Sequence, residues 1–282
     1  MGQILSDLYA VLGNPIEHSR SPVIHRLFAQ QTGQDLQYFK HEVPLGEFGR
    51  FVDHLRQQGY KGVNVTVPFK TDAQAYAQHC SERVVEAGAA NTLKFEGGDV
   101  FADNTDGWGL CQDIVVNAQV PLHGKTILLV GAGGAARGVL VPLLERQPAR
   151  LVLANRTHAK ALEVINTMGL QSMVEVNDFD HWPQNGFDVI INATSAGLGG
   201  QSLDLPAHLF SGCRLAYDMV YGSIDTPFMK WAHDSGCIQT RDGLGMLVEQ
   251  AAKAFEWWRG VMPKTEPVLG AVRAQLMQQR TT

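Results

Sequence analysis

The chain has 282 residues, of which 45% are apolar and 18% charged, and its formal net charge is −5. Enough apolar residues are present to fill one large core or two smaller ones, so a mainly disordered chain is excluded. The 29 Gly and 12 Pro are scattered without a period, which excludes fibrous and coiled-coil classes. The mildly acidic balance disfavours nucleic acid or an anionic membrane as the partner, so we expect a small-molecule ligand.

The four cysteines lie far apart, and none has the spacing of a zinc site. We therefore expect no metal, and buried thiols in a reducing, cytoplasmic compartment. The most apolar stretch, 127–144, contains a glycine cluster, Arg137 and Pro142, so the sequence predicts no membrane span. No secretory signal is expected at the start.

The chain from Leu8 to about Asp106 alternates short apolar runs with helix-like stretches, which predicts an α/β domain. The predicted strands are Leu8–Leu12, Leu36–Val43, Gly62–Val65, Ala89–Phe95 and Val100–Asp103. Helices are predicted from Pro22 to Gly33, with Ser21 as N-cap, and over Leu45–Gln58 and Lys70–Ala77.

A second α/β unit is predicted after a helix over Gly107–Ala118. Thr126–Val130 is a continuous apolar run, as expected for a parallel strand buried on both faces. Runs of the same kind recur at Arg150–Ala154, Phe187–Ile191, Arg214–Asp218 and Cys237–Thr240. Helical patterns separate several of them, which favours a doubly wound parallel sheet. Two final helical stretches, Gly245–Trp258 and Pro267–Gln279, are expected to pack back on the first unit.

The strongest local motif is a glycine-rich turn between the strand ending at Val130 and a helical stretch. It consists of Gly131, Ala132, Gly133, Gly134, Ala135 and Ala136. Glycines in this context permit close approach of the backbone to a pyrophosphate, and the helix N-terminus supplies N–H donors. The motif predicts a dinucleotide site.

The residues after the next strand discriminate between dinucleotides. An NAD enzyme would place a carboxylate there, whereas this chain has Asn155, Arg156 and Thr157, with Lys160 one turn later. A guanidinium can bind a 2′-phosphate bidentately, so NADP is favoured over NAD. An ordinary solvated helix face is the alternative, but cations at a helix N-terminus oppose the helix dipole.

Polar residues at strand ends of the first unit form a second constellation. Lys70 follows a strand and a Pro-containing turn, Asp106 follows another strand, and Asn91 lies in the segment between them. Such residues can assemble a polar site at one sheet edge. Ser19 and Ser21 lie next to a helix N-terminus and could bind a carboxylate, but on this segment alone simple capping by Ser21 is the preferred interpretation.

Nine motifs follow one another along nearly the whole chain. They are G-N-P-I-x-H-S-x-S-P at 13–22, N-V-T-V-P-F-K at 64–70, A-N-T-L at 90–93, D-N-T-D-G at 103–107, G-A-G-G-A-A-R at 131–137, N-R-T at 155–157, N-A-T-S at 192–195, Y-D-M-V-Y at 217–221 and D-G-L-G-M-L-V-E-Q at 242–250. Together and in this order, they resemble the shikimate dehydrogenase family. Arg156 after Asn155 is similar to the NADP-specific biosynthetic branch, rather than the quinate/shikimate branch that also uses NAD.

The resemblance implies reversible NADPH-dependent reduction of 3-dehydroshikimate to shikimate, with Lys70 and Asp106 as the catalytic pair. It also assigns Ser19 and Ser21 to the substrate carboxylate, and Thr66, Asn91 and Gln250 to the ring hydroxyls, with Tyr221 nearby. Thr194, Met219, Gly243 and Met246 would lie near the nicotinamide. The implied domains are 1–106 plus 243–282 for substrate and catalysis, and 107–242 as a Rossmann-type NADP domain.

Two other functions stay open at this point. A relative acting on quinate or an amino analogue of shikimate could use the same Lys70 and Asp106, and a dinucleotide-binding regulator without catalysis could share both domains. We expect no nucleic-acid or membrane partner, and either a monomer or a homodimer.

Overall fold

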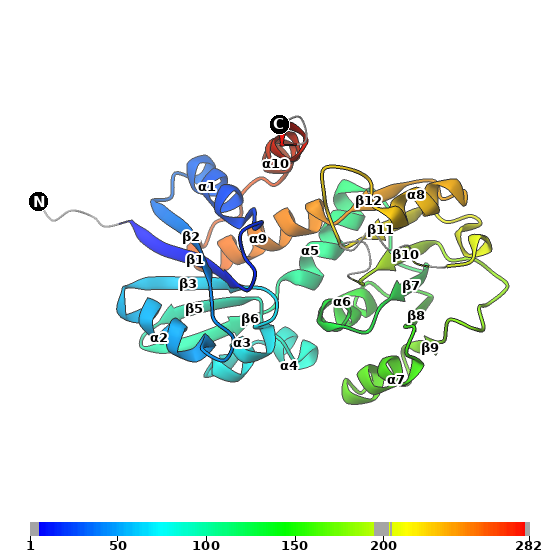
Figure 1. Ribbon diagram of the computed structural model, residues 1–282, viewed down its shortest axis with the longest axis horizontal. Coiled ribbons are helices and arrows are strands. Elements are labelled where there is room, and N and C mark those ends of the chain that lie inside the picture. Colours follow the sequence, from blue (N-terminus) through cyan, green and yellow to red (C-terminus); the bar gives the residue numbers. More distant parts are fainter. Residues whose placement is uncertain (1–5, 195–202, 204, 280–282) are drawn as a thin grey trace, which may run out of the picture. The chain divides into compact units, whose positions relative to one another are not determined.

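The computed structural model describes residues 6–194, 203 and 205–279, and it divides into two compact units (Figure 1). The first comprises the chain up to Asp106 together with Val248–Ala274, and the second comprises Gly107–Leu247 and the residues from Gln275 on. The assignment of substrate to the first unit and NADP to the second stays a prediction.

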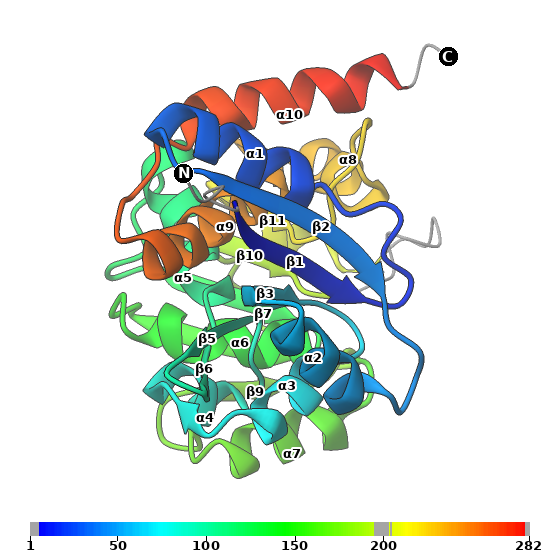
Figure 2. The ribbon, with the colours of Figure 1, turned by 90° about the vertical axis from the view of Figure 1, so that its left-hand side faces the viewer.

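A six-stranded mixed sheet with the order β2-β1-β3-β5-β6-β4 forms the centre of the first unit. Its strands are β1 (Asp7–Gly13), β2 (Leu36–Glu42), β3 (Tyr60–Val65), β4 (His79–Cys80), β5 (Thr92–Glu96) and β6 (Asp99–Asp103). β1 pairs in parallel with both β2 and β3, and Figure 2 shows β1 and β2 side by side. β5 is antiparallel to β3 and β6, so Thr92 lies opposite Asp103.

Helices cover both faces of this sheet. They are α1 (Ser21–Thr32), α2 (Phe48–Gln57), α3 (Lys70–Tyr76), α4 (Glu82–Ala87) and the larger part of α9 (Leu244–Arg259). α2, α3 and α4 contribute to one apolar core with alternate strand residues. On the other face, Tyr9 contacts Trp258 of α9 with ring centroids 4.7 Å apart, and the Trp258 indole donates to the Leu93 carbonyl at 3.1 Å. The predicted packing of a C-terminal helix on the first unit is confirmed.

The second unit contains a parallel six-stranded sheet with the order β12-β11-β10-β7-β8-β9. Its strands are β7 (Thr126–Val130), β8 (Arg150–Ala154), β9 (Glu175–Asn177), β10 (Val189–Asn192), β11 (Leu215–Asp218) and β12 (Thr240–Asp242). The strand order reverses between β7 and β10, which is the switch point where ligands bind in doubly wound sheets. The predicted fold class is confirmed, and β7 and β8 have their predicted bounds.

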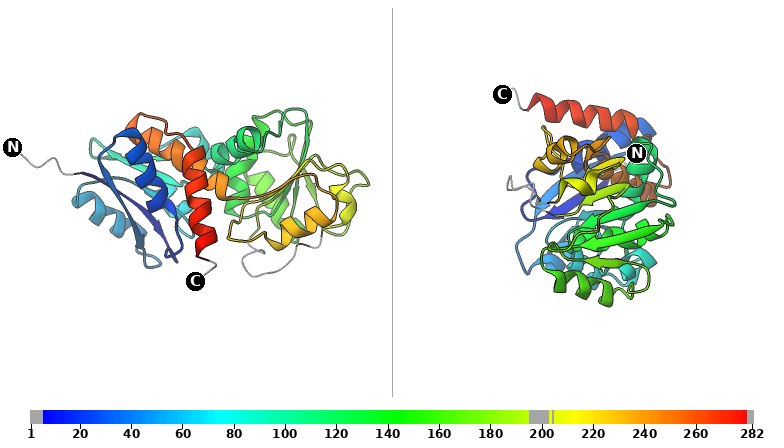
Figure 3. Two further views of the ribbon diagram at one scale, coloured as in Figure 1. Left: turned by 90° about the horizontal axis from the view of Figure 1, so that it is seen from above. Right: turned by 90° about the vertical axis from the view of Figure 1, so that its right-hand side faces the viewer.

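Successive residues of these strands point to opposite faces of the sheet, and each face has its own apolar core. Parallel strands are normally buried on both faces in this way. One core is shared with α5 (Asp106–Gln112), α6 (Gly134–Leu144) and α7 (His158–Thr167), and the other with a 3₁₀ turn (Ala207–Phe210) and α8 (Pro227–Asp234). In Figure 3 the green α6 and the gold α8 lie on opposite sides of the sheet.

The last helix is α10 (Glu266–Gln278). No helix in the described ranges is both long and apolar enough to cross a membrane.

Local departures from the predicted elements have identifiable causes. Ser21 is the first residue of α1, with Arg20 at the N-cap, so the predicted cap was wrong; the Ser19 hydroxyl accepts the Ser21 N–H at 3.4 Å instead. The predicted helix 107–118 ends in a π-helical turn over Asp113–Asn117, because the Ala118 N–H donates to the Asp113 carbonyl. The final strand is Thr240–Asp242 instead of 237–240, and the short β4, β9 and α4 were not predicted.

Candidate active site

Lys70 and Asp106 form an ion pair in the first unit. Lys70 begins α3 after the turn that follows β3, and Asp106 follows β6. The Lys70 Nζ lies 2.5 Å from Asp106 Oδ2, and the two side chains are 28% and 13% exposed. The Lys70 carbonyl accepts the Ala90 N–H at 2.8 Å, which ties the start of α3 to the segment preceding β5. The pair is therefore held by the sheet and remains accessible to a ligand.

Asn91 joins this pair to the other predicted ring-binding residues. Its Nδ2 lies 2.9 Å from Asp106 Oδ1, 2.9 Å from Thr105 Oγ1 and 3.2 Å from Gln250 Oε1. The Asn91 Oδ1 accepts the Thr105 N–H at 2.9 Å. Lys70 at the start of α3, Asn91 just before β5, Asp106 at the start of α5 and Gln250 in α9 thus belong to one polar cluster, although they are far apart in sequence.

The segment before Asp106 is held in place by a pair of residues that sequence reasoning missed, Arg83 and Asp103, which we call the Arg83–Asp103 clamp. Arg83 donates to both carboxylate oxygens of the buried Asp103, at 3.1 and 2.6 Å, and Ser81 donates to Oδ1 at 2.7 Å. The next residue, Asn104, accepts the Asp106 N–H at 3.1 Å. Bidentate arginine–carboxylate pairs fix orientation, so the backbone before Asp106 is held in one place.

Asn64 is a second missed residue. It is buried in β3, and its amide donates to the Thr92 hydroxyl at 3.0 Å and the Asn91 carbonyl at 3.3 Å, while the Tyr38 hydroxyl donates to its Oδ1 at 2.7 Å. An asparagine between two valines in an apolar strand was the signal available in the sequence, because buried amides need partners.

Ser19 and Thr66 lie in the loops that follow the neighbouring strands β1 and β3, and Ser21 begins α1 at the end of the first of these loops. Ser21 is buried, whereas Ser19 and Thr66 are half-buried. The Thr66 N–H donates to the Leu12 carbonyl at 2.9 Å, and a Cβ on Gly13 would lie only 2.6 Å from Thr66 Cγ2. The two loops therefore lie against each other, although no described hydrogen bond joins these hydroxyls directly to Lys70.

In the second unit, the glycine-rich turn joins β7 to α6 as predicted. Gly131 has φ +113°, and a Cβ there would lie 3.0 Å from the Thr194 side chain, so both conformation and space require glycine. A Cβ on Gly133 or Gly134 would meet no neighbouring atom, and Gly134 and Ala135 are exposed. Among the described side chains none caps α6. The turn thus leaves space and N–H donors for a pyrophosphate.

The residues predicted to read the 2′-phosphate follow β8. Arg156, Thr157 and Lys160 are exposed around the start of α7, and the Asn155 amide donates to the Thr157 carbonyl at 2.9 Å. The first turn of α7 has no acidic residue. The arrangement therefore fits an anionic group bound at this end of the sheet.

The ends of β10 and β11 place the residues predicted near the nicotinamide. Asn192 accepts from the Thr194 hydroxyl at 2.7 Å and donates to Asp218 at 3.0 Å, and burial raises the pKa of Asp218. A Cβ on Gly243 would lie 2.2 Å from the Met219 carbonyl oxygen, so these two backbones are in contact.

Met246 is buried in the first turn of α9, and Tyr221 is half-buried in the second unit. Ser195, which completes the N-A-T-S motif, lies outside the described residues.

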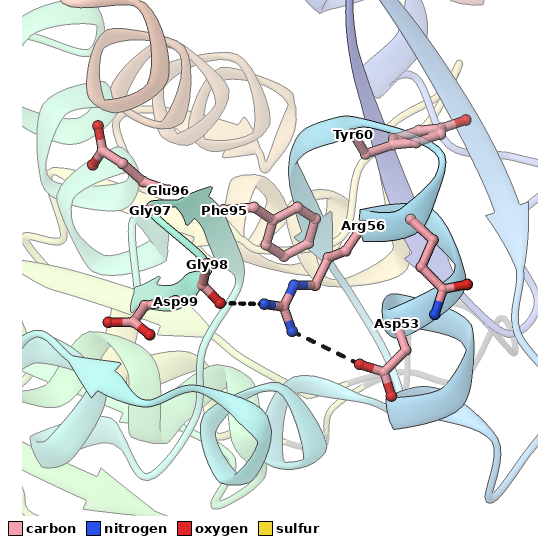
Figure 4. Close-up of a pocket in the computed structure, with 9 residues that line it drawn as sticks. Asp53, Arg56, Tyr60, Phe95, Glu96, Gly97, Gly98 and Asp99 are labelled. Carbon is pink, nitrogen blue, oxygen red and sulfur yellow. Dashed lines mark hydrogen bonds and ion pairs between the residues drawn. The ribbon is translucent and has the colours of Figure 1, made fainter.

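A hollow of about 420 Å³ in the first unit is lined by none of the predicted site residues (Figure 4). Its walls are Asp53, Arg56, Gln57, Tyr60 and 95–99. Arg56 is engaged there by the Gly98 carbonyl at 2.5 Å and by Asp53 at 3.7 Å, as the dashed lines in Figure 4 mark. Three acidic side chains, Asp53, Glu96 and Asp99, make this hollow unsuited to an anionic ligand.

A dinucleotide-type turn at the head of a doubly wound sheet, with an ammonium–carboxylate pair on a separate α/β unit, defines a nicotinamide-dependent oxidoreductase. Comparison with known proteins identifies the family. Residues 11–93 match the shikimate dehydrogenase substrate binding domain, 114–198 match shikimate / quinate 5-dehydrogenase, and 243–273 match the shikimate 5'-dehydrogenase C-terminal domain.

Individual relatives agree over nearly the full length. The chain is 53% identical to a shikimate dehydrogenase (NADP(+)) of Herminiimonas arsenicoxydans, covering 96% of this chain and 99% of the relative. Among solved structures, an Ael1 enzyme from Pseudomonas putida matches with TM-score 0.90 and 46% identity over 96% of this chain and 98% of that one. Shikimate 5-dehydrogenase from Thermus thermophilus, in complex with NADP(H) and shikimate, matches with TM-score 0.85 and 31% identity over 96% and 100%. The chain belongs to the shikimate dehydrogenase family, the NADP-dependent oxidoreductases of aromatic biosynthesis.

Proposed function

We propose that Lys70 and Asp106 carry the reversible reduction of 3-dehydroshikimate to shikimate. The observation that carries this proposal is their ion pair at 2.5 Å. The Asn91 amide donates hydrogen bonds to the second carboxylate oxygen of Asp106 and to the Gln250 side chain. A cyclic polyhydroxy acid needs such a cluster of amide, carboxylate and ammonium groups to bind its ring hydroxyls.

Lys70 stabilises the negative charge that develops when the carbonyl oxygen becomes an alkoxide, and its ammonium can donate the proton that completes the alcohol. Bound NADPH supplies the hydride, and in the reverse direction NADP+ accepts it. Asp106 orients the ammonium and accepts a hydrogen bond from a substrate hydroxyl through the oxygen that Asn91 also contacts. In oxidation Lys70 takes the proton back in its neutral form.

The other residues proposed to contact the substrate bind it and fix its orientation. Thr66, Asn91 and Gln250 contact ring hydroxyls, and Ser19 and Ser21 donate to the carboxylate, with Tyr221 beside the substrate. Ser21 begins the twelve-residue helix α1, whose N-terminal dipole favours an anion.

The cofactor residues divide by the part of NADP they hold. Gly131, Gly133, Gly134 and Ala135 supply the pyrophosphate turn, where the open space over Gly133 and Gly134 supports this role. Asn155, Arg156, Thr157 and Lys160 bind the adenosine 2′-phosphate end. Thr194, Met219, Gly243 and Met246 contact the nicotinamide end.

Activity on quinate is a second candidate, because 114–198 match a family described as shikimate / quinate 5-dehydrogenase. An amino analogue of shikimate could also use the same catalytic pair. A matrix of kcat/KM values for shikimate and quinate, each with NADP and NAD, tests the proposal. Shikimate with NADP is expected to be the best pair, and equal or better turnover of quinate with NAD would overturn this choice.

The matrix also tests a dinucleotide-binding regulator without catalysis. The accessible Lys70–Asp106 pair argues against it. NADP binding without shikimate-dependent NADP reduction would support the regulator.

We further propose a cytoplasmic enzyme that is a monomer or a homodimer. Four cysteines without a disulfide support the reducing compartment. Cell fractionation and sedimentation of the purified chain test the two statements.

A further inference from the structure

A buried carboxylate behind the nicotinamide end has no role in the reaction described so far. Asp113 is 0% exposed and begins the π-helical turn that follows α5. Its Oδ2 accepts the Tyr217 hydroxyl at 2.7 Å, and its Oδ1 accepts the Asn117 amide at 2.9 Å and lies 3.5 Å from Arg241 Nη1. A fully buried carboxylate is costly unless it is paired in this way, so the network has one preferred arrangement.

Tyr217 connects this carboxylate to the start of α9. Burial raises the pKa of Tyr217 well above its ordinary value, so the hydroxyl keeps its single proton, which it donates to Asp113. The hydroxyl oxygen accepts the Met246 N–H at 3.3 Å. That N–H is among those in the first turn of a helix that have no partner within the helix.

The first turn of α9 is also in direct steric contact with the carboxylate. A Cβ on Gly245 would lie 2.0 Å from Asp113 Oδ1, so a side chain at this position would force the turn away from Asp113. A negative charge against a helix N-terminus is favourable, which adds to the attraction between Asp113 and this turn.

We propose that Asp113 and Tyr217 are positioning residues that fix the first turn of α9. They thereby hold Gly243 and Met246 where these two residues can contact the nicotinamide. This inference rests on the proposed function, because it takes Met246 to contact the nicotinamide. Neither residue is among those proposed to contact substrate or cofactor. They act through the backbone of α9, while the 2′-phosphate end of NADP depends on the separate segment after β8.

The first test replaces Tyr217 with Phe in the full chain. Tyr217→Phe removes the acceptor of the Met246 N–H with little change in volume. We expect kcat/KM for NADP in shikimate oxidation to fall about tenfold or more, because small misplacements of reacting groups cost one to two orders of magnitude. The inhibition constant of 2′,5′-ADP, which has no nicotinamide, is expected to change less than about twofold by the same argument.

Tyr60→Phe is the matched control. It also removes the hydroxyl of a buried tyrosine, which in this case contacts His41 at 3.0 Å, and we expect kinetic constants like those of the parent chain. Gly245→Ala is the second variant, because it adds a methyl group against Asp113 without removing any polar group. It should show the same selective loss, and it carries the test if Tyr217→Phe does not fold.

The outcomes distinguish failure of the positioning role of Asp113 and Tyr217 from failure of the proposed function. If the parent chain oxidises shikimate with NADP and both variants match it, the positioning role is overturned while the proposed function stands. An equal loss for NADP and 2′,5′-ADP also overturns it, because that result means general damage to the second unit. A parent chain that binds NADP but does not oxidise shikimate overturns the proposed function itself.

Discussion

Lys70 and Asp106 are 36 residues apart in sequence, yet the Lys70 Nζ lies 2.5 Å from an Asp106 carboxylate oxygen, and the other oxygen is 2.9 Å from the Asn91 amide. The carboxylate therefore has one oxygen turned to the ammonium and the other to the Asn91 amide. This division places the proposed proton donor next to the amides proposed to bind ring hydroxyls, so in the proposed mechanism substrate orientation and proton transfer depend on the same side chain.

Replacing Lys70 with Ala tests the proton-donor role. Because the charge on the substrate oxygen grows in the transition state, kcat should fall by about 10²–10⁴-fold, far more than KM for shikimate rises. Steady-state kinetics of shikimate oxidation measure both. Lys94→Ala is the control, since Lys94 pairs with Glu96 at 2.9 Å outside the polar cluster. A change confined to KM would contradict the catalytic role of Lys70.

Replacing Arg156 with Ala tests the NADP preference. Loss of charge-assisted hydrogen bonds to the 2′-phosphate should weaken NADP binding by about 10–100-fold and leave NAD almost unchanged. Titration of both nucleotides by intrinsic fluorescence gives the two dissociation constants. Arg214→Ala removes another exposed arginine from the same unit and should change neither. Equal weakening of NADP and NAD would place the 2′-phosphate elsewhere.

The sequence predicted the parallel sheet of the second unit well, because its strands are continuous apolar runs whose burial depends little on context. β7 and β8 have their predicted bounds. Elements with few apolar residues were missed: β4 has two exposed residues, and β9 has three residues of which none is fully buried. Such strands exist because a neighbouring strand offers hydrogen bonds, which a local pattern cannot reveal.

The candidate site was predicted from motifs, while its supporting residues became visible only in three dimensions. Arg83 supports Asp103 from α4, an element that was not predicted, and Asp113 lies in a turn whose π geometry has no local signature. Tyr217 falls within a motif, yet its partner is 104 residues away. Pairings over such sequence separations are set by the fold, so single-sequence reasoning could not assign them.

His25 should make the first unit sensitive to acid. The ring is fully buried and stacks on Tyr38 with centroids 4.2 Å apart, and burial lowers the pKa of His25 to about 3. Below pH 6.5 the unfolded chain binds a proton that the folded chain does not, so stability is lost as pH falls from 6.5 towards 3. At pH 5 this loss is about 2 kcal/mol relative to pH 7.

His25→Phe keeps an aromatic ring in the cluster and removes the titration. Urea unfolding of the parent chain and the variant at pH 7 and pH 5 measures the difference, and the variant should lose about 2 kcal/mol less on acidification. His233→Phe, which changes a histidine with a side chain 79% exposed, should behave like the parent chain. An identical pH response of His25→Phe and the parent chain would exclude this role for His25.

The Arg83–Asp103 clamp should contribute to both stability and activity. Arg83→Met removes two hydrogen bonds from a carboxylate that is 4% exposed, and leaves it with the Ser81 hydroxyl at 2.7 Å and the Asn104 N–H at 2.8 Å. Because the remaining donors compensate in part, we expect the free energy of unfolding to fall by about 2 kcal/mol. Activity should fall as well, since Asn104 and Asp106 follow directly in the chain.

Urea unfolding and steady-state kinetics measure the two effects, and Arg50→Met is the matched control. Arg50 pairs with Glu47 at 3.3 Å, but its side chain is 86% exposed, so its removal should change stability by less than about 0.5 kcal/mol. Arg83→Lys keeps the charge without the two-pronged geometry, and should recover stability only in part. If Arg83→Met unfolds like Arg50→Met and keeps full kcat, the clamp does not hold Asp106 in place.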